Sequence, residues 1–139
     1  MQSDKLINVV AAVVERDGLY LISQRHAHAV FPLYWEFPGG KVEPGEDDST
    51  ALRREMKEEL NAQVEVDDLL ERRVHCYEGF SVDFRAYRCR LVNDDLKPLY
   101  VADFKWVVME DLAQYRFPPA DEAAIALLTG VSDEVEGCR

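Results

Sequence analysis

Residues 40–62 read GKVEPGEDDSTALRREMKEELNA, and this stretch decides how the chain folds. Its second half, residues 51–60, consists almost entirely of strong helix formers. The polar residues 47–50 before it offer several helix caps and place negative charge at the positive end of a helix dipole. Leu52 and Met56 recur at the spacing of one helical face. The sequence therefore predicts a capped helix here with one buried side.

The predicted helix carries three glutamates that share one side. Residues three and four positions apart lie on the same helical face, so Glu55, Glu58 and Glu59 come close together. Carboxylates this close repel one another unless a cation lies between them, and hard divalent ions such as Mg²⁺ prefer oxygen ligands. A charged helical segment is more often a solvated face, here paired internally through Arg53, Arg54 and Lys57. Composition alone does not decide between these two interpretations.

The wider spacing favours metal binding. Gly40 is followed by Glu46 six residues later, by the pair at 54–55 eight residues after that, and then by the pair at 58–59. This arrangement resembles the Nudix box, in which the spacing is Gly, five residues, Glu, seven residues, Arg-Glu, an aliphatic residue, any residue and Glu-Glu. We expect Arg54 to pair with Glu46 and to tie the preceding loop to the helix.

Two late positions depart from the Nudix box. The glycine that ends the family's helix is Asn61 here, and the aliphatic residue after it is Ala62. Asparagine tolerates the left-handed backbone conformation better than most residues with a side chain. We therefore interpret the change at Asn61 as a structural substitution that leaves the chemistry in place.

The resemblance extends beyond the box. Residues 24–25 (QR), 35–41 (WEFPGGK) and 117–121 (FPPAD) are similar to the MutT-type branch, which hydrolyses nucleoside triphosphates to the monophosphate and pyrophosphate. It implies one Nudix domain over residues 1–139, an α/β fold in which a mixed β-sheet is flanked by helices as an α/β/α sandwich.

The residues themselves support a mixed α/β domain. Alternation and β-branched residues predict strands, and helix formers with proline and glycine boundaries predict two helices after the box. Two adjacent glycines predict a tight change of direction over residues 37–40. The expected strands are 6–14, 19–23, 62–77, 81–92 and 104–108, and the later helices are 109–114 and 121–129.

The resemblance also assigns catalytic roles. It implies that Glu55, Glu58 and Glu59 bind Mg²⁺, with Mn²⁺ as a possible substitute and with the Gly40 carbonyl as a further ligand. It places Arg54 in the catalytic set and makes Glu55 a candidate general base. Relatives often carry another acid on a loop, at the position of Tyr100 here. Two interpretations remain open: one of three nearby acids replaces the loop acid, or all three are surface charges. The number of metals also remains open. The nearby acids are Asp94, Asp95 and Asp103.

The sequence says less about which residues bind the substrate. In the relatives the position of Asp121 lies in the nucleobase pocket, and an ionised aspartate only accepts hydrogen bonds, from cytosine or from a guanine edge. A helix cap at Asp121 is the plainer alternative. Arg25 is a candidate contact for phosphate or base, with a surface pairing role as the alternative, and Phe37 is a candidate stacking surface for the base. Other aromatic candidates for stacking are Tyr34, Trp35 and Phe80, although such residues are often core.

The leading hypothesis is therefore a Mg²⁺-dependent (deoxy)nucleoside triphosphate pyrophosphohydrolase that clears 8-oxo-dGTP, or CTP and modified dCTP. Alternatives are a Nudix hydrolase of a dinucleotide or nucleotide sugar, and a non-catalytic nucleotide-binding module. A net charge of −11 argues against a nucleic-acid duplex as partner. Three cysteines without a CxxC pair argue against a disulfide framework or zinc site. Without a signal-like or membrane-spanning stretch, we expect a cytoplasmic monomer or homodimer.

Overall fold

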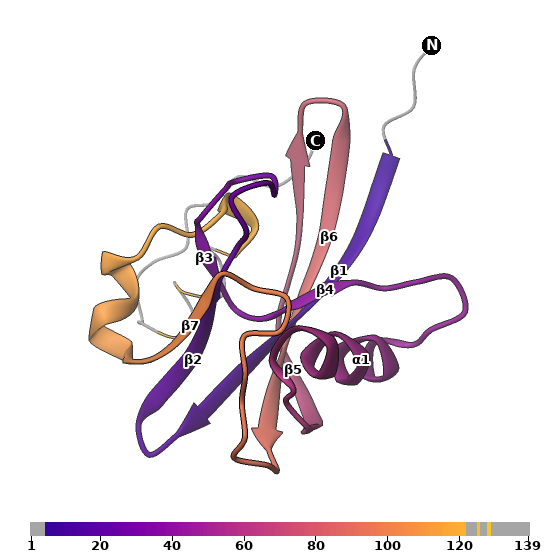
Figure 1. Ribbon diagram of the computed structural model, residues 1–139. Coiled ribbons are helices and arrows are strands. Elements are labelled where there is room, and N and C mark those ends of the chain that lie inside the picture. The colour runs from indigo at the N-terminus through magenta and orange to yellow at the C-terminus, as the bar shows by residue number, and fades with distance from the viewer. Residues whose placement is uncertain (1–4, 122–124, 126–127, 129–139) are drawn as a thin grey trace.

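The computed structural model describes residues 5–121 together with Ile125 and Leu128. Strands dominate this part of the chain, and one long α-helix lies between the fourth and fifth strands (Figure 1). The elements in chain order are β1 (Lys5–Arg16), β2 (Leu19–Gln24), β3 (Trp35–Glu36), β4 (Gly39–Lys41), α1 (Asp48–Leu60), β5 (Val64–Tyr77), β6 (Phe80–Leu91), β7 (Asp103–Val108) and the 3₁₀ helix η1 (Met109–Gln114).

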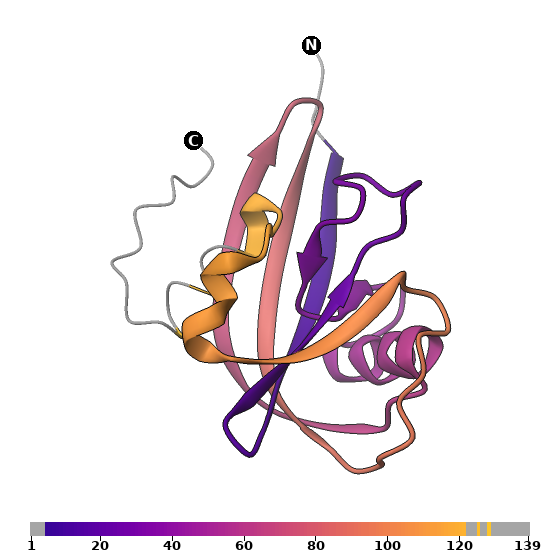
Figure 2. The same cartoon turned by 60° about the vertical axis from the view of Figure 1, so that its left-hand side comes forward.

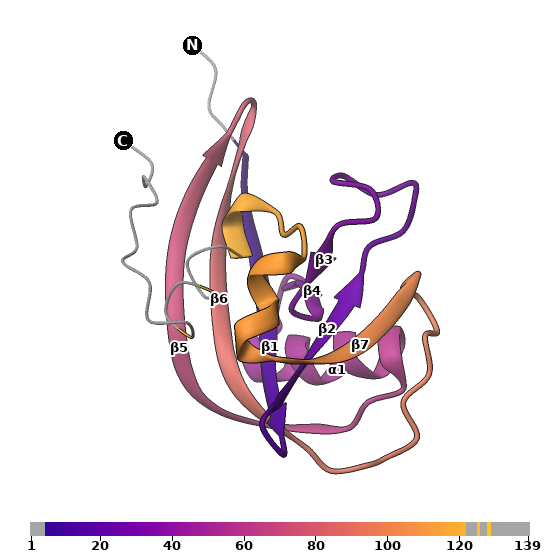
Figure 3. The same ribbon diagram turned by 90° about the vertical axis from the view of Figure 1, so that its left-hand side faces the viewer.

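The strands form one seven-stranded sheet in the order β3-β2-β1-β6-β5, with β4 paired to β1 and β7 paired to β2. The β1–β6 pair is parallel and the other pairs are antiparallel, so the sheet is mixed. Figure 2 shows β5 and β6 as a long hairpin beside β1. Helices α1 and η1 lie on opposite sides of the sheet (Figure 3). The predicted fold class, a mixed sheet flanked by helices, is confirmed.

Two hydrophobic cores, one on each side of the sheet, fix the layers. Leu52, Met56 and Leu60 of α1 are fully buried in the first core. Burying each of these side chains stabilises the packing by about 1.5–3 kcal/mol. The second core lies on the side of η1 and includes Phe84 and Leu112. Because the buried stripe of α1 faces the sheet, its glutamates can only lie on the flanks of the helix.

Helix α1 begins three residues earlier than predicted, because Asp47 supplies the cap. Its carboxylate accepts a 2.8 Å hydrogen bond from the backbone N–H of Thr50. At the other end Asn61 has a φ of 54°, and its backbone N–H donates to the last-turn carbonyls. The predicted left-handed cap at Asn61 is confirmed.

The chain bends at Pro38 within residues 37–40, as predicted, but the prediction that Gly39 and Gly40 make the turn is wrong. Both residues belong to β4 and pair with Ala11 and Val10 of β1. A Cβ atom on Gly39 would lie 2.0 Å from the Val10 carbonyl oxygen, and one on Gly40 would lie 1.6 Å from Oε2 of Glu55. The two glycines are required by close approach and not by unusual backbone angles.

The predicted helix at residues 121–129 begins at Pro119, a residue suited to the first helical turn, and lies mostly outside the described residues. Asp121 therefore sits within the first turn and is not the N-cap. Residues 109–114 are helical as predicted, but of the 3₁₀ type. Cys76 is disulfide-bonded, which the odd cysteine count did not predict, whereas Cys89 is a free, buried thiol. Within the described residues no helix is long and apolar enough to cross a membrane.

Candidate active site

A cavity of about 1000 Å³ opens between α1, β3, β4 and the faces of β1 and β6. Gly40, with Glu55 over it, pairs with Val10 of β1, whereas Phe80 pairs with Lys5 at the start of β1, so the cavity has an acidic end and an aromatic end. Most of the residues predicted for catalysis, metal binding or substrate binding line it: Arg25, Phe37, Gly40, Arg54, Glu55, Glu58, Glu59 and Asp121. The predicted residues are thus brought together, although they come from elements far apart in the sequence.

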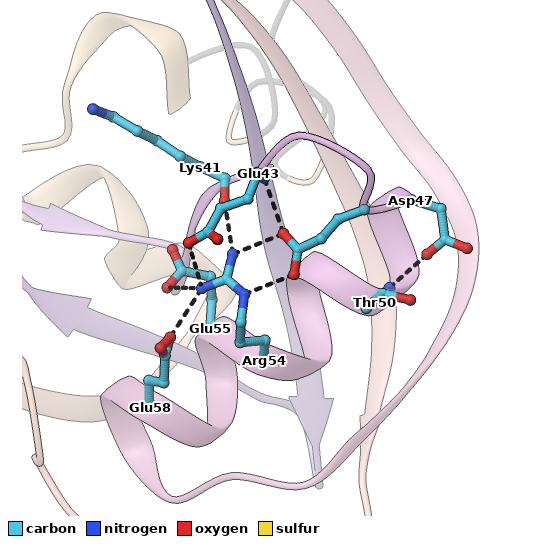
Figure 4. Close-up of polar contacts among 8 residues, drawn as sticks. Lys41, Glu43, Asp47, Thr50, Arg54, Glu55 and Glu58 are labelled. Atoms are coloured by element: carbon cyan, nitrogen blue, oxygen red, sulfur yellow. Dashed lines mark hydrogen bonds and ion pairs between the residues drawn. The ribbon is translucent and has the colours of Figure 1, made fainter.

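Arg54 forms the centre of the acidic end (Figure 4). Its Nε and Nη2 donate to the two carboxylate oxygens of Glu46 at 2.7 and 2.9 Å, and Nη2 also donates to the Lys41 carbonyl at 3.1 Å. The guanidinium lowers the pKa of Glu46 to about 2. The predicted pairing of Arg54 with Glu46 is confirmed. It fixes the loop that leads from β4 into α1.

The third nitrogen of Arg54, Nη1, contacts two glutamates of α1. Nη1 lies 2.9 Å from Oε1 of Glu58 and 3.4 Å from Oε1 of Glu55, as Figure 4 shows. Glu58 is about half exposed at the rim, whereas the Glu55 side chain is 16% exposed and lies over Gly40. Burial raises the pKa of Glu55, and Arg54 partly offsets that shift.

Glu59 also lies on the cavity wall. Its Oε1 is buried and has no hydrogen-bond partner. Burial, followed by the charges of Glu36 and Glu55, raises the pKa of Glu59 to about 9. The carboxylate therefore lies where the negative charge of its neighbours is only partly offset by positive charge.

Glu36 was missed by the sequence reasoning. It lies at the end of β3, lines the cavity and accepts a 2.7 Å hydrogen bond from Nη1 of Arg25. Burial raises its pKa despite the opposing effect of Arg25. The signal available in the sequence was an acid within the WEFPGGK stretch, but only the pairing of β3 with β2 brings it towards α1.

The acidic end fits a hard divalent cation by its donor chemistry, since it offers only oxygen ligands and contains the unpartnered oxygen of Glu59. Among residues 5–121, 125 and 128, no three His, Cys, Asp or Glu side chains already stand in the arrangement of a metal site. Arg54 instead provides the positive charge between Glu55 and Glu58.

The predicted substrate residues have partners within the protein. Phe37 is only 2% exposed and packs on Phe117 with ring centroids 5.7 Å apart, so it is mainly a core residue. Its backbone N–H donates to Oδ2 of the buried Asp121 at 3.2 Å. Arg25 donates from Nε to the Val30 carbonyl at 2.6 Å as well as to Glu36. These contacts position the three residues along one wall.

The aromatic end of the cavity only partly matches the expected stacking residues. Phe80 lines it and stacks on Tyr77, with centroids 4.9 Å apart. Phe31, which was not predicted, packs on Tyr77. Tyr34 and Trp35 do not line the cavity and pack instead against other rings and cations, namely Phe31, Lys105, Tyr115 and Arg116.

The loop before β7 supplies no acid to the cavity within the described residues. Tyr100 lines it, but its side chain is 69% exposed and packs on His26. The three nearby aspartates do not line the cavity and are engaged elsewhere. Asp94 pairs with Arg16, Asp95 accepts from Asn61 and Asn93, and Asp103 accepts from the N–H of Phe104.

Comparisons with known proteins agree on one family. A family model described as NUDIX domain matches residues 9–127. CTP pyrophosphohydrolase of Escherichia coli is 36% identical over 127 residues, covering 88% of this chain and 94% of that protein. Nucleoside triphosphatase NudI of Salmonella newport is 33% identical, covering 86% and 94%. The crystal structure of a MutT NUDIX hydrolase from Burkholderia pseudomallei superposes with a TM-score of 0.79 at 25% identity, covering 93% and 100%.

Proposed function

Because this chain belongs to the NUDIX domain family, we propose that it is a Mg²⁺-dependent hydrolase that converts (deoxy)nucleoside triphosphates to the monophosphate and pyrophosphate. The CTP pyrophosphohydrolase and the nucleoside triphosphatase among its relatives support this reaction class. Nudix hydrolases generally use a divalent metal. We assign Mg²⁺ because the donors at the acidic end are oxygens.

A single observation carries the proposal: one cavity joins an acidic end to an aromatic end. A nucleoside triphosphate has the matching polarity, with a flat base at one end and a polyanionic chain at the other. Carboxylates alone would repel that chain, so the phosphates bind only together with a cation. The volume of about 1000 Å³ lies at the upper end of the usual range for a ligand site.

We assign the acidic residues as follows. Glu55, Glu58 and Glu59, with the Gly40 carbonyl, would hold the cation. When bound, it supplies positive charge that offsets the charge developing on the leaving phosphate. Glu55, beside the cavity and only partly compensated by Arg54, accepts the proton of the attacking water. Arg54 holds the loop from β4 against α1, so the Gly40 carbonyl and Glu55 keep their relative positions.

The substrate wall favours a base with an exposed amino group. The buried Asp121 carboxylate can only accept hydrogen bonds when it is ionised. Cytosine presents one amino donor, and a guanine edge presents two neighbouring donors. The relative named CTP pyrophosphohydrolase, at 36% identity, supports CTP as the first candidate, and modified dCTP and 8-oxo-dGTP are the further candidates. Clearance of such nucleotides from the pool would be the cellular role.

Product analysis with a nucleotide panel tests the proposal. With Mg²⁺, we expect pyrophosphate release from a triphosphate, with kcat/KM highest for CTP or a modified dCTP. Two monophosphates from a dinucleotide or nucleotide sugar would point to that other Nudix substrate class instead. Glu59→Gln should reduce turnover by about two orders of magnitude or more while the protein stays folded.

The matched control is Glu110→Gln, which neutralises an exposed glutamate outside the cavity and should leave turnover unchanged. Normal turnover by Glu59→Gln would refute the assignment. No turnover of any nucleotide by the wild-type protein, together with measurable nucleotide binding, would instead support a non-catalytic binding module. The complete set of glutamates on α1 argues against that outcome.

A further inference from the structure

We infer that Glu36, held by Arg25, is a further carboxylate of the divalent-cation site and replaces the loop acid that Tyr100 does not provide. This inference rests on the proposed function, because it deepens the same site. It goes beyond that function by assigning a residue from β3, outside the glutamate helix, to cation binding.

The first observation is the position of the acids. The described loop before β7 places an exposed tyrosine at the cavity, and its aspartates do not line the cavity. Glu36 lies on the cavity wall, with a side chain that is 17% exposed. Among the acids that line the cavity in the described residues, Glu36 and Asp121 come neither from α1 nor from the loop that enters it, and Asp121 accepts a hydrogen bond from the Phe37 N–H.

The second observation is that Glu36 and Glu59 line the same cavity. The Glu59 oxygen that lacks a partner is therefore in a region shared with Glu36. A cation beside that oxygen would have both carboxylates as neighbours.

The third observation is the way in which Arg25 holds Glu36. Nη1 of Arg25 contacts Oε1 of Glu36 at 2.7 Å, and the Val30 carbonyl fixes Nε of Arg25 at 2.6 Å. Within the described part of the chain, no hydrogen bond occupies Oε2 of Glu36. One oxygen thus orients the side chain while the other remains available to a cation.

The pair also explains how the acidic end tolerates its charge. Glu36, Glu55 and Glu59, from two elements, line the same cavity, and Arg25 gives Glu36 a cationic partner. Arg54 serves Glu55 in a similar way. Glu59 has a buried oxygen without a hydrogen-bond partner, so it is the point at which an incoming cation gains most.

Titration of the full-length protein with Mn²⁺ alone, followed by electron paramagnetic resonance of free Mn²⁺, tests the inference without any turnover. We expect Glu36→Gln to raise the Mn²⁺ Kd about tenfold or more. The matched control is Asp103→Asn, which removes one carboxylate from the loop end of β7 outside the cavity and should leave Kd unchanged. The increase in Tm caused by Mn²⁺ should shrink for Glu36→Gln only.

A wild-type Kd for Glu36→Gln would overturn the inference, and so would a weakened Kd for Asp103→Asn, because the loop acid would then be the missing ligand. If Glu36→Gln does not fold, Glu36→Asp decides. It keeps the charge but withdraws the carboxylate by one methylene, so a raised Kd supports the inference and a wild-type Kd overturns it.

Glu59→Gln separates this inference from the proposed function. If Glu59→Gln loses Mn²⁺ binding while Glu36→Gln keeps it, the inference about Glu36 fails and the proposed function stands. If both variants bind Mn²⁺ like the wild-type protein, the cation site on α1 is itself wrong, and the proposed function fails with it.

Discussion

Arg54 donates from both Nε and Nη2 to the carboxylate of Glu46, eight residues earlier in the chain. The bidentate contact joins the loop after β4 to the second turn of α1. Since Gly40 lies before that loop and Glu55 directly follows Arg54, the pair sets the distance between a backbone carbonyl and a carboxylate of the site. The relationship is one of positioning, and it leads to the first prediction.

Arg54→Lys should preserve the fold and lower kcat by about ten- to a hundredfold, because lysine keeps the charge but cannot make the two parallel hydrogen bonds. Steady-state kinetics with the best nucleotide of the panel measure the effect, and thermal denaturation checks the fold. The control is Arg53→Lys, one residue earlier and exposed on the same helix, and it should leave kcat unchanged. Equal kcat values for the two variants would show that Arg54 does not position the site.

Gly40→Ala should lower turnover by about a hundredfold, since the added Cβ must displace the Glu55 carboxylate from the position it now holds. Gly18→Ala is the comparison, because its φ of 80° makes the change cost about 1–2 kcal/mol of stability with open space around the new methyl group. We therefore expect a lower Tm with normal kcat for Gly18→Ala. Full activity of Gly40→Ala would show that the space over this glycine is not used in catalysis.

The network that anchors the start of α1 should make the protein sensitive to acid. Asp48 accepts from Nε and Nη2 of Arg85 at 2.7 and 2.9 Å and from the Tyr87 hydroxyl at 2.5 Å. The Arg85 hydrogen bonds, opposed by partial burial and assisted by Tyr87, hold the pKa of Asp48 below 3.8. A folded-state pKa below the unfolded value gives stability that is complete above pH 3.8 and is lost as pH falls through the lower folded value.

Asp48→Asn should therefore destabilise the protein by about 2 kcal/mol at pH 7 and by progressively less below pH 4. Urea denaturation at a series of pH values measures this difference. Asp68→Asn, an exposed aspartate whose contact with Arg88 is 3.9 Å long, should change stability little at any pH. A constant deficit of Asp48→Asn across the pH range would contradict the assigned cause.

The parts of the site that follow from local spacing could be predicted from the sequence. The common side of Glu55, Glu58 and Glu59, the pairing of Arg54 with Glu46 and the cap at Asn61 all depend on residues within one helix or its adjoining loop. Helical periodicity fixes such relations before any tertiary contact forms. The mixed sheet followed from alternation and from the resemblance to the family.

The relations that depend on strand pairing could not be predicted. Glu36 lines the same cavity as Glu59 only because β3 pairs with β2 and α1 packs against the sheet. The role of Gly39 likewise depends on β4 lying against β1, a contact that two glycines in sequence do not reveal. Phe37 was expected at the substrate and is mainly core, because the direction of its side chain is set by the ring of Phe117.

Cation binding should become tighter as pH rises towards 9, because the cation and a proton compete for Glu59. Burial and the neighbouring acids raise the pKa of this carboxylate from 4.5 to about 9 in the protein without metal, so at pH 7 a proton must leave when the cation binds. The Mn²⁺ Kd of the protein alone should fall about tenfold per pH unit between pH 6 and 8, the slope expected for release of one proton.

The raised pKa of Glu59 has the opposite effect on folding stability, which falls as pH rises. A carboxyl group whose folded pKa lies above the unfolded value of 4.5 binds more protons in the folded state, so stability declines as pH rises from 4.5 to about 9. Glu59→Gln removes that decline and should be more stable than the wild-type protein at pH 8 without metal. Added Mn²⁺ should raise the Tm of the wild-type protein and leave that of Glu59→Gln nearly unchanged. A Kd independent of pH, together with equal stability of the two proteins at pH 8, would show that Glu59 is ionised without a cation.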